Sequence, residues 1–526
     1  MKQVCRGFFA LAIVAGATTA WVEHALIGAQ GAEFDLGPIE RVLVAGRAVW
    51  FYMASLVWPF GLVFQYPRWV VSATTWWQYL FPLSLAALMA GLWRLRDRTR
   101  GLLAALLLFG AALAPALGFV NVFPFRYSFV ADHFQYMATL AAIGFLASAL
   151  TAIAAPRIPT PAARGVLSII VIAPLAWLSW THAHQYTDSE TLYRTTIARN
   201  PSAWMAYHNL SVLKLNGAER DLPGALKYAE ESIRIEPRNA EALNTRGYIR
   251  QQLGDFDSAR RDYEASIRLS PTFASPHNNL GVLDYRQGRL EDAMTNYREA
   301  MRLNPKDPEA QRNLGIVLMD LGRTAEADPY IRRAYALNPE SPEVLSNLAS
   351  LTLREGRLDE AVALFQRALA LQPDFPAARN NLGITLEKLG RFPEAEQQYR
   401  EVLRLDPQSS IAQDNLGYVL LQQRKFAETV AHWTDVLRQR PDAAVAHAGR
   451  AAALEGLGRL DESIAAYREA IRFPENAQSA NVRNDFGVAL AQRGRTAEAV
   501  EQFREALRLN PAHPNARANL ARAQGK

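Results

Sequence analysis

An asparagine recurs along the chain at a spacing that could build a binding surface. The series comprises Asn209, Asn279, Asn313, Asn347, Asn381, Asn415 and Asn519. Thr245, Gly449 and Asp485 interrupt it. An asparagine amide carries one acceptor and two donors, so it can hold a peptide backbone at two points without reading side chains. We therefore treat the seven asparagines as candidate peptide-binding residues; the alternative is that they hydrogen-bond between neighbouring helices.

Two carboxylates near the N-terminus are candidate catalytic groups. Glu33 and Asp35 lie close together in the segment GAQGAEFDLGP. A transferase needs a carboxylate as general base toward an acceptor hydroxyl, and such a pair could supply it. The alternative is that both carboxylates belong to a solvated loop.

A second polar group precedes an apolar stretch. Arg126 and His133, with Asp132 between them, could hold a lipid-linked phosphate. The alternative is an arginine that reaches to the membrane interface beside a paired Asp132 and His133. His182 and His184 lack a third ligand at metal-binding spacing, so we predict no metal and no cofactor.

The asparagines belong to a repeat that must position them. Residues 376–407 read as two helices, with Leu382 and Gly383 in the first and Ala395 and Tyr399 on one face of the second. A proline stops the second helix. That proline recurs every 34 residues, at Pro237, Pro271, Pro305, Pro339, Pro373, Pro407 and Pro441.

This pattern resembles the tetratricopeptide repeat, whose 34 residues carry Leu-Gly, then Ala, then an aromatic residue, then Pro. The resemblance implies an all-α solenoid, a right-handed superhelix of helix pairs. We expect a half-repeat at 187–201, nine repeats over 202–511 and a capping helix at 514–524. The repeats at 202–237 and before Pro474 are out of step. The asparagine series is similar to the asparagine ladder in the repeat arm of the nucleocytoplasmic O-GlcNAc transferase.

Composition divides the chain into two predicted domains, 1–186 and 187–526. Residues 1–186 hold 12 Lys and Arg against 6 Asp and Glu, and the remainder holds 45 of each. The net charge of +6 therefore belongs to the first part and does not indicate nucleic-acid binding. Cys5 is the only cysteine, which excludes an internal disulfide.

Residues 1–186 read as an N-terminal set of transmembrane helices, since a span needs about 20 apolar residues. Nine of the 11 tryptophans lie here, many at stretch ends, as interfacial residues do. The apolar stretches are 7–25, 42–64, 74–93, 101–122, 134–154 and 165–182.

Arginines give the predicted orientation. Arg94, Arg96, Arg98 and Arg100 crowd the expected loop after 74–93, and two more arginines flank the loop before the last stretch. The positive-inside rule places both loops in the cytoplasm, so the repeats lie outside it, on a multi-pass protein of the inner membrane. Two versions stay open: five spans with 42–64 in the interface, or six spans with the N-terminus outside.

The membrane part resembles the C-terminal portion of the membrane domain of transmembrane-and-tetratricopeptide-repeat O-mannosyltransferases. Residues 47–82 and 121–146 carry the resemblance, with Val-Ala-Asp-His at 130–133 where that family has Val-Ala-Glu-Arg. It implies an enzyme that takes a sugar from a polyprenyl phosphate. The family's catalytic acid lies in an earlier part, which has no counterpart in this sequence.

The prediction is therefore a membrane anchor that carries a solenoid binding proteins or peptides along its concave face. The alternative is the C-terminal part of a glycosyltransferase that moves a sugar from a polyprenyl-phosphate carrier to protein Ser or Thr. The bilayer is a partner in both, and nucleic acid in neither.

The predicted orientation has a direct test. A reporter that works only outside the cytoplasm should be active when fused after Lys526 and silent when inserted between Arg94 and Arg100. The reverse pattern would place the repeats in the cytoplasm.

Overall fold

A computed structural model describes residues 36–57, 66–113, 186–217 and 220–525, with isolated positions between 160 and 180. The chain forms two compact units, Met1–Asn279 and Leu280–Lys526. Their boundary falls inside one repeat helix, α12 (Ala274–Arg286). The division predicted at 186 and 187 stays a prediction.

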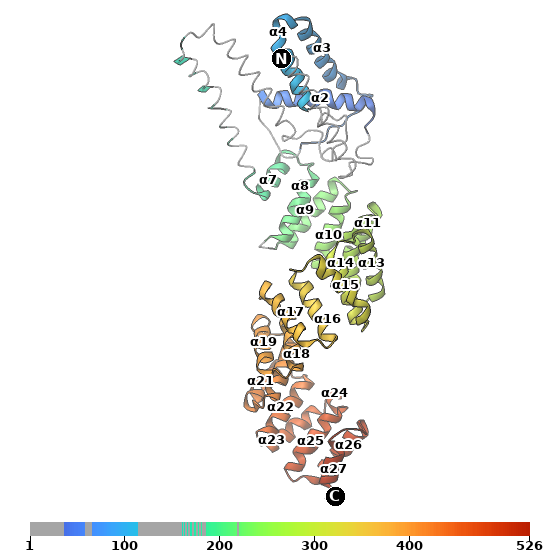
Figure 1. Cartoon of the computed structure of the whole chain (residues 1–526), viewed down its shortest axis with the longest axis vertical. Coiled ribbons are helices and arrows are strands. Elements are labelled where there is room, and N and C mark those ends of the chain that lie inside the picture. Colours follow the sequence, from blue (N-terminus) through green and yellow to red (C-terminus); the bar gives the residue numbers. More distant parts are fainter. Residues whose placement is uncertain are drawn as a thin grey trace. The chain divides into compact units, whose positions relative to one another are not determined.

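The described N-terminal part holds three α-helices, which Figure 1 draws in blue. Helix α2 (Pro38–Val57) packs on α3 (Leu80–Arg94), which packs on α4 (Arg96–Leu113). The 3-10 turn η3 (Trp76–Tyr79) precedes α3. Arg47, the charge within the predicted stretch 42–64, lies with its guanidinium 4.3 Å from the centre of the Trp69 ring. This cation–π contact gives the arginine a partner among apolar residues.

Two details of the predicted spans are wrong. The stretch 74–93 is α-helical only from Leu80, because η3 occupies Trp76–Tyr79. The arginines from Arg94 to Arg100 form no loop, since Leu95 alone separates α3 from α4. Arginine is a good helix former, and Asp97 in the first turn of α4 favours that helix start.

The remaining stretches lie wholly or partly outside the described residues: 7–25, 134–154, most of 165–182 and the ends of 42–64 and 101–122. Among the described residues, no helix combines the length and the apolar character needed to cross a bilayer.

From residue 189 onward the chain is a series of helix pairs, as predicted. Helix α7 (Ser189–Arg199) is the half-repeat and α27 (Ala516–Ala523) the cap. The first helices are α8 (Trp204–Asn216), α10 (Ala240–Gln252), α12, α14 (Pro308–Asp320), α16 (Pro342–Arg354), α18 (Pro376–Lys388), α20 (Ser410–Gln422), α22 (Ala444–Gly456) and α25 (Ala480–Gln492). The second helices are α9 (Leu222–Ile235), α11 (Phe256–Leu269), α13 (Leu290–Leu303), α15 (Thr324–Leu337), α17 (Leu358–Leu371), α19 (Phe392–Leu405), α21 (Phe426–Gln439), α23 (Leu460–Ala470) and α26 (Thr496–Leu509).

A glycine and an aromatic ring set the distance between the two helices of a pair. A Cβ added at Gly383 would lie 2.5 Å from Cε1 of Tyr399, so only glycine fits against the ring. Ala395 and Tyr399 are fully buried in the same core. Gly390 has φ +73°, which glycine adopts without strain, and it ends the first helix as predicted.

The carbonyl of the stopping proline is itself bound. Gln413 donates from Nε2 to the carbonyl of Pro407 at 3.0 Å, and His447 donates from Nε2 to that of Pro441 at 2.8 Å. A side chain six residues after the proline therefore stabilises the turn between repeats by a hydrogen bond to the proline carbonyl. The sequence does not reveal this contact, because glutamine, histidine and arginine all make it at the same place.

The out-of-step repeat before Pro474 has a simple cause. Helix α23 ends at Ala470, and a one-turn helix α24 (Pro474–Ala477) follows it. Asn476 fixes this turn by donating from Nδ2 to the carbonyl of Ala444 at 2.6 Å.

In residues 280–526, the second helices from α15 onward pack against the first helix of their own repeat, and every second helix from α13 onward packs against the helix that opens the next repeat or the cap. Consecutive first helices, such as α16 and α18 or α20 and α22, also contact one another, and they lie closer together than consecutive second helices do. A stack of this kind curves toward its first helices, which therefore line the concave side.

Overpacking one pair tests this register. Ala361 is fully buried on α17, so Ala361→Trp should cost about 1–3 kcal/mol or more of stability and lower the melting temperature. Ala363 lies exposed on the same helix, and Ala363→Trp is the matched control. Equal melting of the two variants, followed by circular dichroism on the full chain, would show that the register is wrong.

Candidate functional site

The structure places the whole asparagine series on first helices and on the cap. Asn313 is 8 % exposed, and the other six side chains are half-buried. Within residues 280–526 these helices line the concave side, so the asparagines there follow one surface. Their partial burial leaves only part of each amide accessible to a ligand.

Three asparagines bind an asparagine of the preceding repeat. The donor is Nδ2 in each case: Asn279 to Oδ1 of Asn244 at 2.9 Å, Asn415 to Oδ1 of Asn380 at 3.0 Å, and Asn519 to Oδ1 of Asn484 at 2.9 Å. Every acceptor lies 35 residues earlier, on the previous first helix. Hydrogen bonding between neighbouring helices, the alternative stated for the series, therefore occurs at these positions.

The other asparagines do not share this geometry. Asn381 also reaches the previous first helix, where Nδ2 donates to Oγ of Ser350 at 3.4 Å, and Asn313 accepts from Nη2 of Arg312 at 3.2 Å. Asn209 and Asn347 show no side-chain hydrogen bond to other described residues. One series thus contains amides that hydrogen-bond between helices and, at Asn209 and Asn347, amides that make no side-chain hydrogen bond to other described residues.

Gly449 interrupts the series for a steric reason. The aromatic place of the preceding repeat holds Trp433, and a Cβ at Gly449 would lie 2.5 Å from its Nε1 atom. The largest aromatic side chain in the series of pairs therefore excludes an asparagine at the neighbouring place. The sequence alone does not show that the Trp433 ring lies against position 449.

An apolar patch adjoins Asn415. Ile411 and Tyr418 are 63 % and 48 % exposed on α20, and Val445 is 54 % exposed at the start of α22. Ile411, Asn415 and Tyr418 fall at i, i+4 and i+7, on one helical face. We name Ile411, Tyr418 and Val445 the apolar patch. The repeat pattern alone does not predict this patch, although Ile411 and Val445 occupy the same place in successive repeats.

Two acidic side chains lie near each other between α22 and α25. Burial and the nearby Asp485 carboxylate raise the pKa of Glu455 to about 7. Burial also raises the pKa of Asp485, which accepts from Nδ2 of Asn484 at 3.1 Å. Gln492 donates from Nε2 to Oε1 of Glu455 at 3.0 Å. Asp485 occupies an asparagine place, whereas Glu455 lies on α22 six residues after Gly449, the asparagine place of its repeat.

The remaining sequence candidates lie outside the described residues. These are the carboxylates Glu33 and Asp35, the pair Arg126 and His133 with Asp132 between them, and the two histidines His182 and His184. Within the described ranges, no group of three or more His, Cys, Asp and Glu side chains gathers as metal ligands would.

Family models match most of the repeat region. The model described as tetratricopeptide repeat matches residues 444–476, and that described as TPR repeat matches residues 487–526. The helix pairs are tetratricopeptide repeats. A further model, described as cilia and flagella-associated protein 70 C-terminal domain, matches residues 198–457. None of these matches bears on the resemblance to O-mannosyltransferases, which stays a prediction.

Several solved structures are similar to the chain. A tetratricopeptide repeat protein from Parabacteroides merdae is 19 % identical over 48 % of this chain and 98 % of its own, with a TM-score of 0.37. A thermophilic TPR protein from Thermus thermophilus is 28 % identical over 35 % of this chain and 100 % of its own, at 0.32. PilF of Pseudomonas aeruginosa is 21 % identical over 41 % and 97 %, at 0.36. A comparison with curated proteins finds no match.

The buried acids predict a pH dependence. The pKa of Glu455 is higher in the folded protein than in the unfolded chain, so the folded state holds the proton more tightly. The contribution of this carboxyl to stability is therefore complete at a pH below its ordinary pKa, where both the folded and the unfolded protein carry the proton. That contribution is lost as the pH rises through about 7. Glu455→Gln should therefore raise the melting temperature more at pH 8 than at pH 5.

The matched control is Glu475→Gln, because Glu475 is exposed on α24. This variant should leave the shape of the pH profile unchanged. If Glu455→Gln shifted the melting temperature equally at both pH values, the buried state of this carboxyl would be contradicted.

Proposed function

We propose that the repeats bind extended peptides along their first-helix face, with the apolar patch as the main contact. The observation that carries this proposal is the exposure of Ile411, Tyr418 and Val445 beside Asn415. Exposed apolar side chains gathered on the first helices of two successive repeats favour a contact site there.

The spacing of the repeats suits an extended chain. Neighbouring helices pack about 8–10 Å apart, and an extended peptide rises about 3.3 Å per residue. One repeat therefore meets every third peptide residue, roughly, so a peptide could place apolar side chains on the patch at regular intervals. Asn347, Asn381 and Asn415 lie on consecutive first helices and offer amide groups to its backbone.

We also propose that residues 1–186 anchor the repeats to a membrane. The support is the apolar stretches of the sequence and the exposure of large apolar side chains in the described N-terminal part. Leu83 and Trp93 on α3 are 62 % and 61 % exposed, and Trp76 on η3 is 76 % exposed. Such side chains are stable in contact with lipid or with another apolar surface. The location of the repeats outside the cytoplasm is part of this proposal.

The glycosyltransferase alternative has no comparable support. Its candidate groups Glu33, Asp35, Arg126 and His133 all lie outside the described residues. A polyprenyl-phosphate sugar therefore stays a partner predicted from the resemblance alone.

Removing the apolar patch tests the peptide proposal. Ile411→Ser with Val445→Ser should weaken binding of a fluorescent decapeptide of alternating apolar and polar residues by about tenfold or more, since each buried side chain contributes about 1–2 kcal/mol. Both residues are exposed, so the melting temperature should hardly change. Leu371→Ser, at a 49 % exposed position on the second helix α17, is the matched control. Unchanged affinity in the double variant would refute the proposal.

A second variant in the same binding experiment tells whether the asparagines bind the peptide backbone or only hydrogen-bond between helices. Replacing Asn313, Asn347, Asn381 and Asn415 together by alanine should weaken peptide binding if the amides hold the backbone. Each lost contact contributes about 0.5–1.5 kcal/mol. If the quadruple variant melted much earlier but bound the decapeptide unchanged, the asparagines would serve only to fasten the repeats.

A further inference from the structure

Arg450 occupies a place that leucine or phenylalanine fills in most repeats. The equivalent side chains are between 0 and 7 % exposed and belong to the core: Leu280, Leu314, Leu348, Leu382, Leu416 and Phe486. An arginine at such a place brings a charge into the packing between helices, and burying a charge is costly unless it is paired.

One other repeat shows how this arrangement accommodates an arginine. Arg246, at the same place, donates from Nε and Nη2 to the two carboxylate oxygens of Asp262, at 2.9 Å and 2.6 Å. Arg250 adds a third hydrogen bond to Asp262 at 2.9 Å. The Asp262 side chain is 4 % exposed, so a buried carboxylate neutralises the guanidinium in a two-point contact.

The repeat of Arg450 lacks that carboxylate. Six repeats after Arg246 comes Arg450, and six repeats after Asp262 comes Ala466. The places of Arg250 and Glu230, which also pair with each other, are taken by Leu454 and Thr434. In the network around Arg246, the three charged partners are Asp262, Arg250 and Glu230. Smaller or apolar residues stand at their three places around Arg450.

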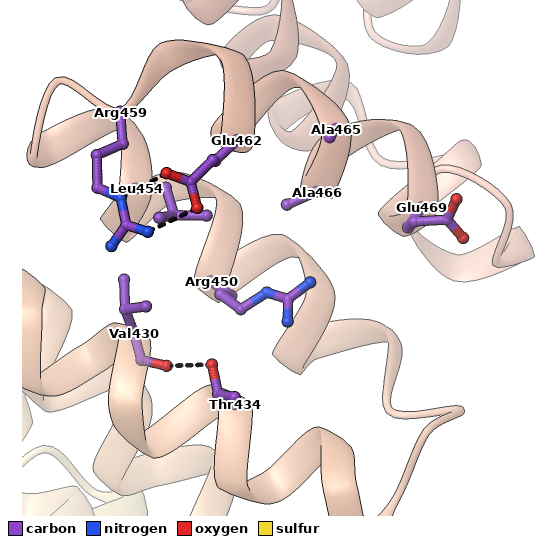
Figure 2. A pocket seen from close by; sticks show the side chains of 9 residues that line it. All are labelled: Val430, Thr434, Arg450, Leu454, Arg459, Glu462, Ala465, Ala466 and Glu469. Carbon is purple, nitrogen blue, oxygen red and sulfur yellow. Dashed lines mark hydrogen bonds and ion pairs between the residues drawn. The ribbon is translucent and has the colours of Figure 1, made fainter.

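A pocket of about 360 Å³ lies where those side chains would be. Figure 2 shows Arg450 extending into the space between α21, which carries Val430 and Thr434, and α23, which carries Ala466 and Glu469. The Thr434 hydroxyl donates to the carbonyl of Val430 at 2.7 Å.

The other charges of the pocket already have partners. Arg459 and Glu462 form a salt bridge at 2.6 Å, and Glu469 accepts from Arg472 at 2.7 Å. Arg450 makes no hydrogen bond or ion pair with the described residues, and its Nε atom is buried. Its guanidinium therefore has no hydrogen-bonded counterion among the described residues, and the Glu462 carboxylate, paired with Arg459, acts on it only through the electrostatic field.

We propose that this pocket binds a carboxylate, held by Arg450 as Asp262 is held by Arg246. The carboxylate comes either from an acidic side chain of a bound peptide or from a small free acid. The site is independent of the apolar patch and of the asparagine series, so either proposal can fail while the other stands.

Calorimetric titration of the full chain tests this site with three probes. They are a capped pentapeptide with one glutamate among alanines, the same peptide with glutamine in its place, and succinate. The glutamate peptide should bind about tenfold to a hundredfold more tightly than the glutamine peptide, as expected for hydrogen bonds to a charged group. Succinate binding without peptide binding would support the site with a free acid as its ligand. No binding of either carboxylate, or equal binding of the two peptides, would overturn the proposal.

Two variants tie the binding to the pocket. Arg450→Leu restores the residue found at most equivalent places, so it should fold and abolish carboxylate binding. Ala466→Asp keeps the arginine and introduces an internal carboxylate at the place of Asp262, so it should also abolish binding while raising the melting temperature. Carboxylate binding that survives in either folded variant would overturn the proposal.

A control removes the same charge elsewhere. Arg438→Leu on α21 changes an arginine whose side chain is 74 % exposed and which pairs with Asp435 outside the pocket. It should bind the carboxylate probes as the unaltered protein does. An equal loss of binding in this control would show that overall charge, rather than the pocket, attracts the probes.

Discussion

The contact between a glycine and an aromatic ring sets the spacing of the two helices in a repeat, and the rest of the solenoid depends on it. Gly383 lies against Tyr399 so closely that no side chain fits between them, and Gly417 lies against Trp433 in the same way. Two helices held this close share one apolar face that they cannot bury alone. Each pair therefore packs against the next, and the chain extends as a stack.

The same constraint explains the exceptions along the stack. Because tryptophan is larger than tyrosine, Trp433 excludes an asparagine at Gly449 and interrupts the series there. The early end of α23 is accommodated by the short helix α24, so the next pair, α25 and α26, still forms. Where Arg450 replaces a core leucine, a pocket opens between helices. A change of one core residue thus produces the break in the asparagine series or the pocket, while the helix pairs stay the same.

Much of this architecture follows from the sequence, because the repeat is local. Helix ends at glycine and proline, the pairing of Ala395 with Tyr399 and the irregular repeat before Pro474 can all be read from 34-residue spacing. The hydrogen bond from Asn415 to Asn380 could not, since both residues are asparagine and either could have faced solvent. The apolar patch was missed because exposure depends on how α20 and α22 meet. The helical state of Arg94 to Arg100 is not evident from the sequence, because a cluster of arginines is compatible with a loop as well as with a helix.

The central claim is that the first helices, and not the second, form the binding face. Photo-crosslinking tests this most directly, with a photoreactive amino acid placed at Tyr418 on α20 or at Arg438 on α21, both of which are exposed. The fluorescent decapeptide of alternating apolar and polar residues serves as ligand. The account predicts crosslinked peptide from the Tyr418 position and none above background from the Arg438 position. Crosslinking from Arg438 alone, or equally from both positions, would contradict it.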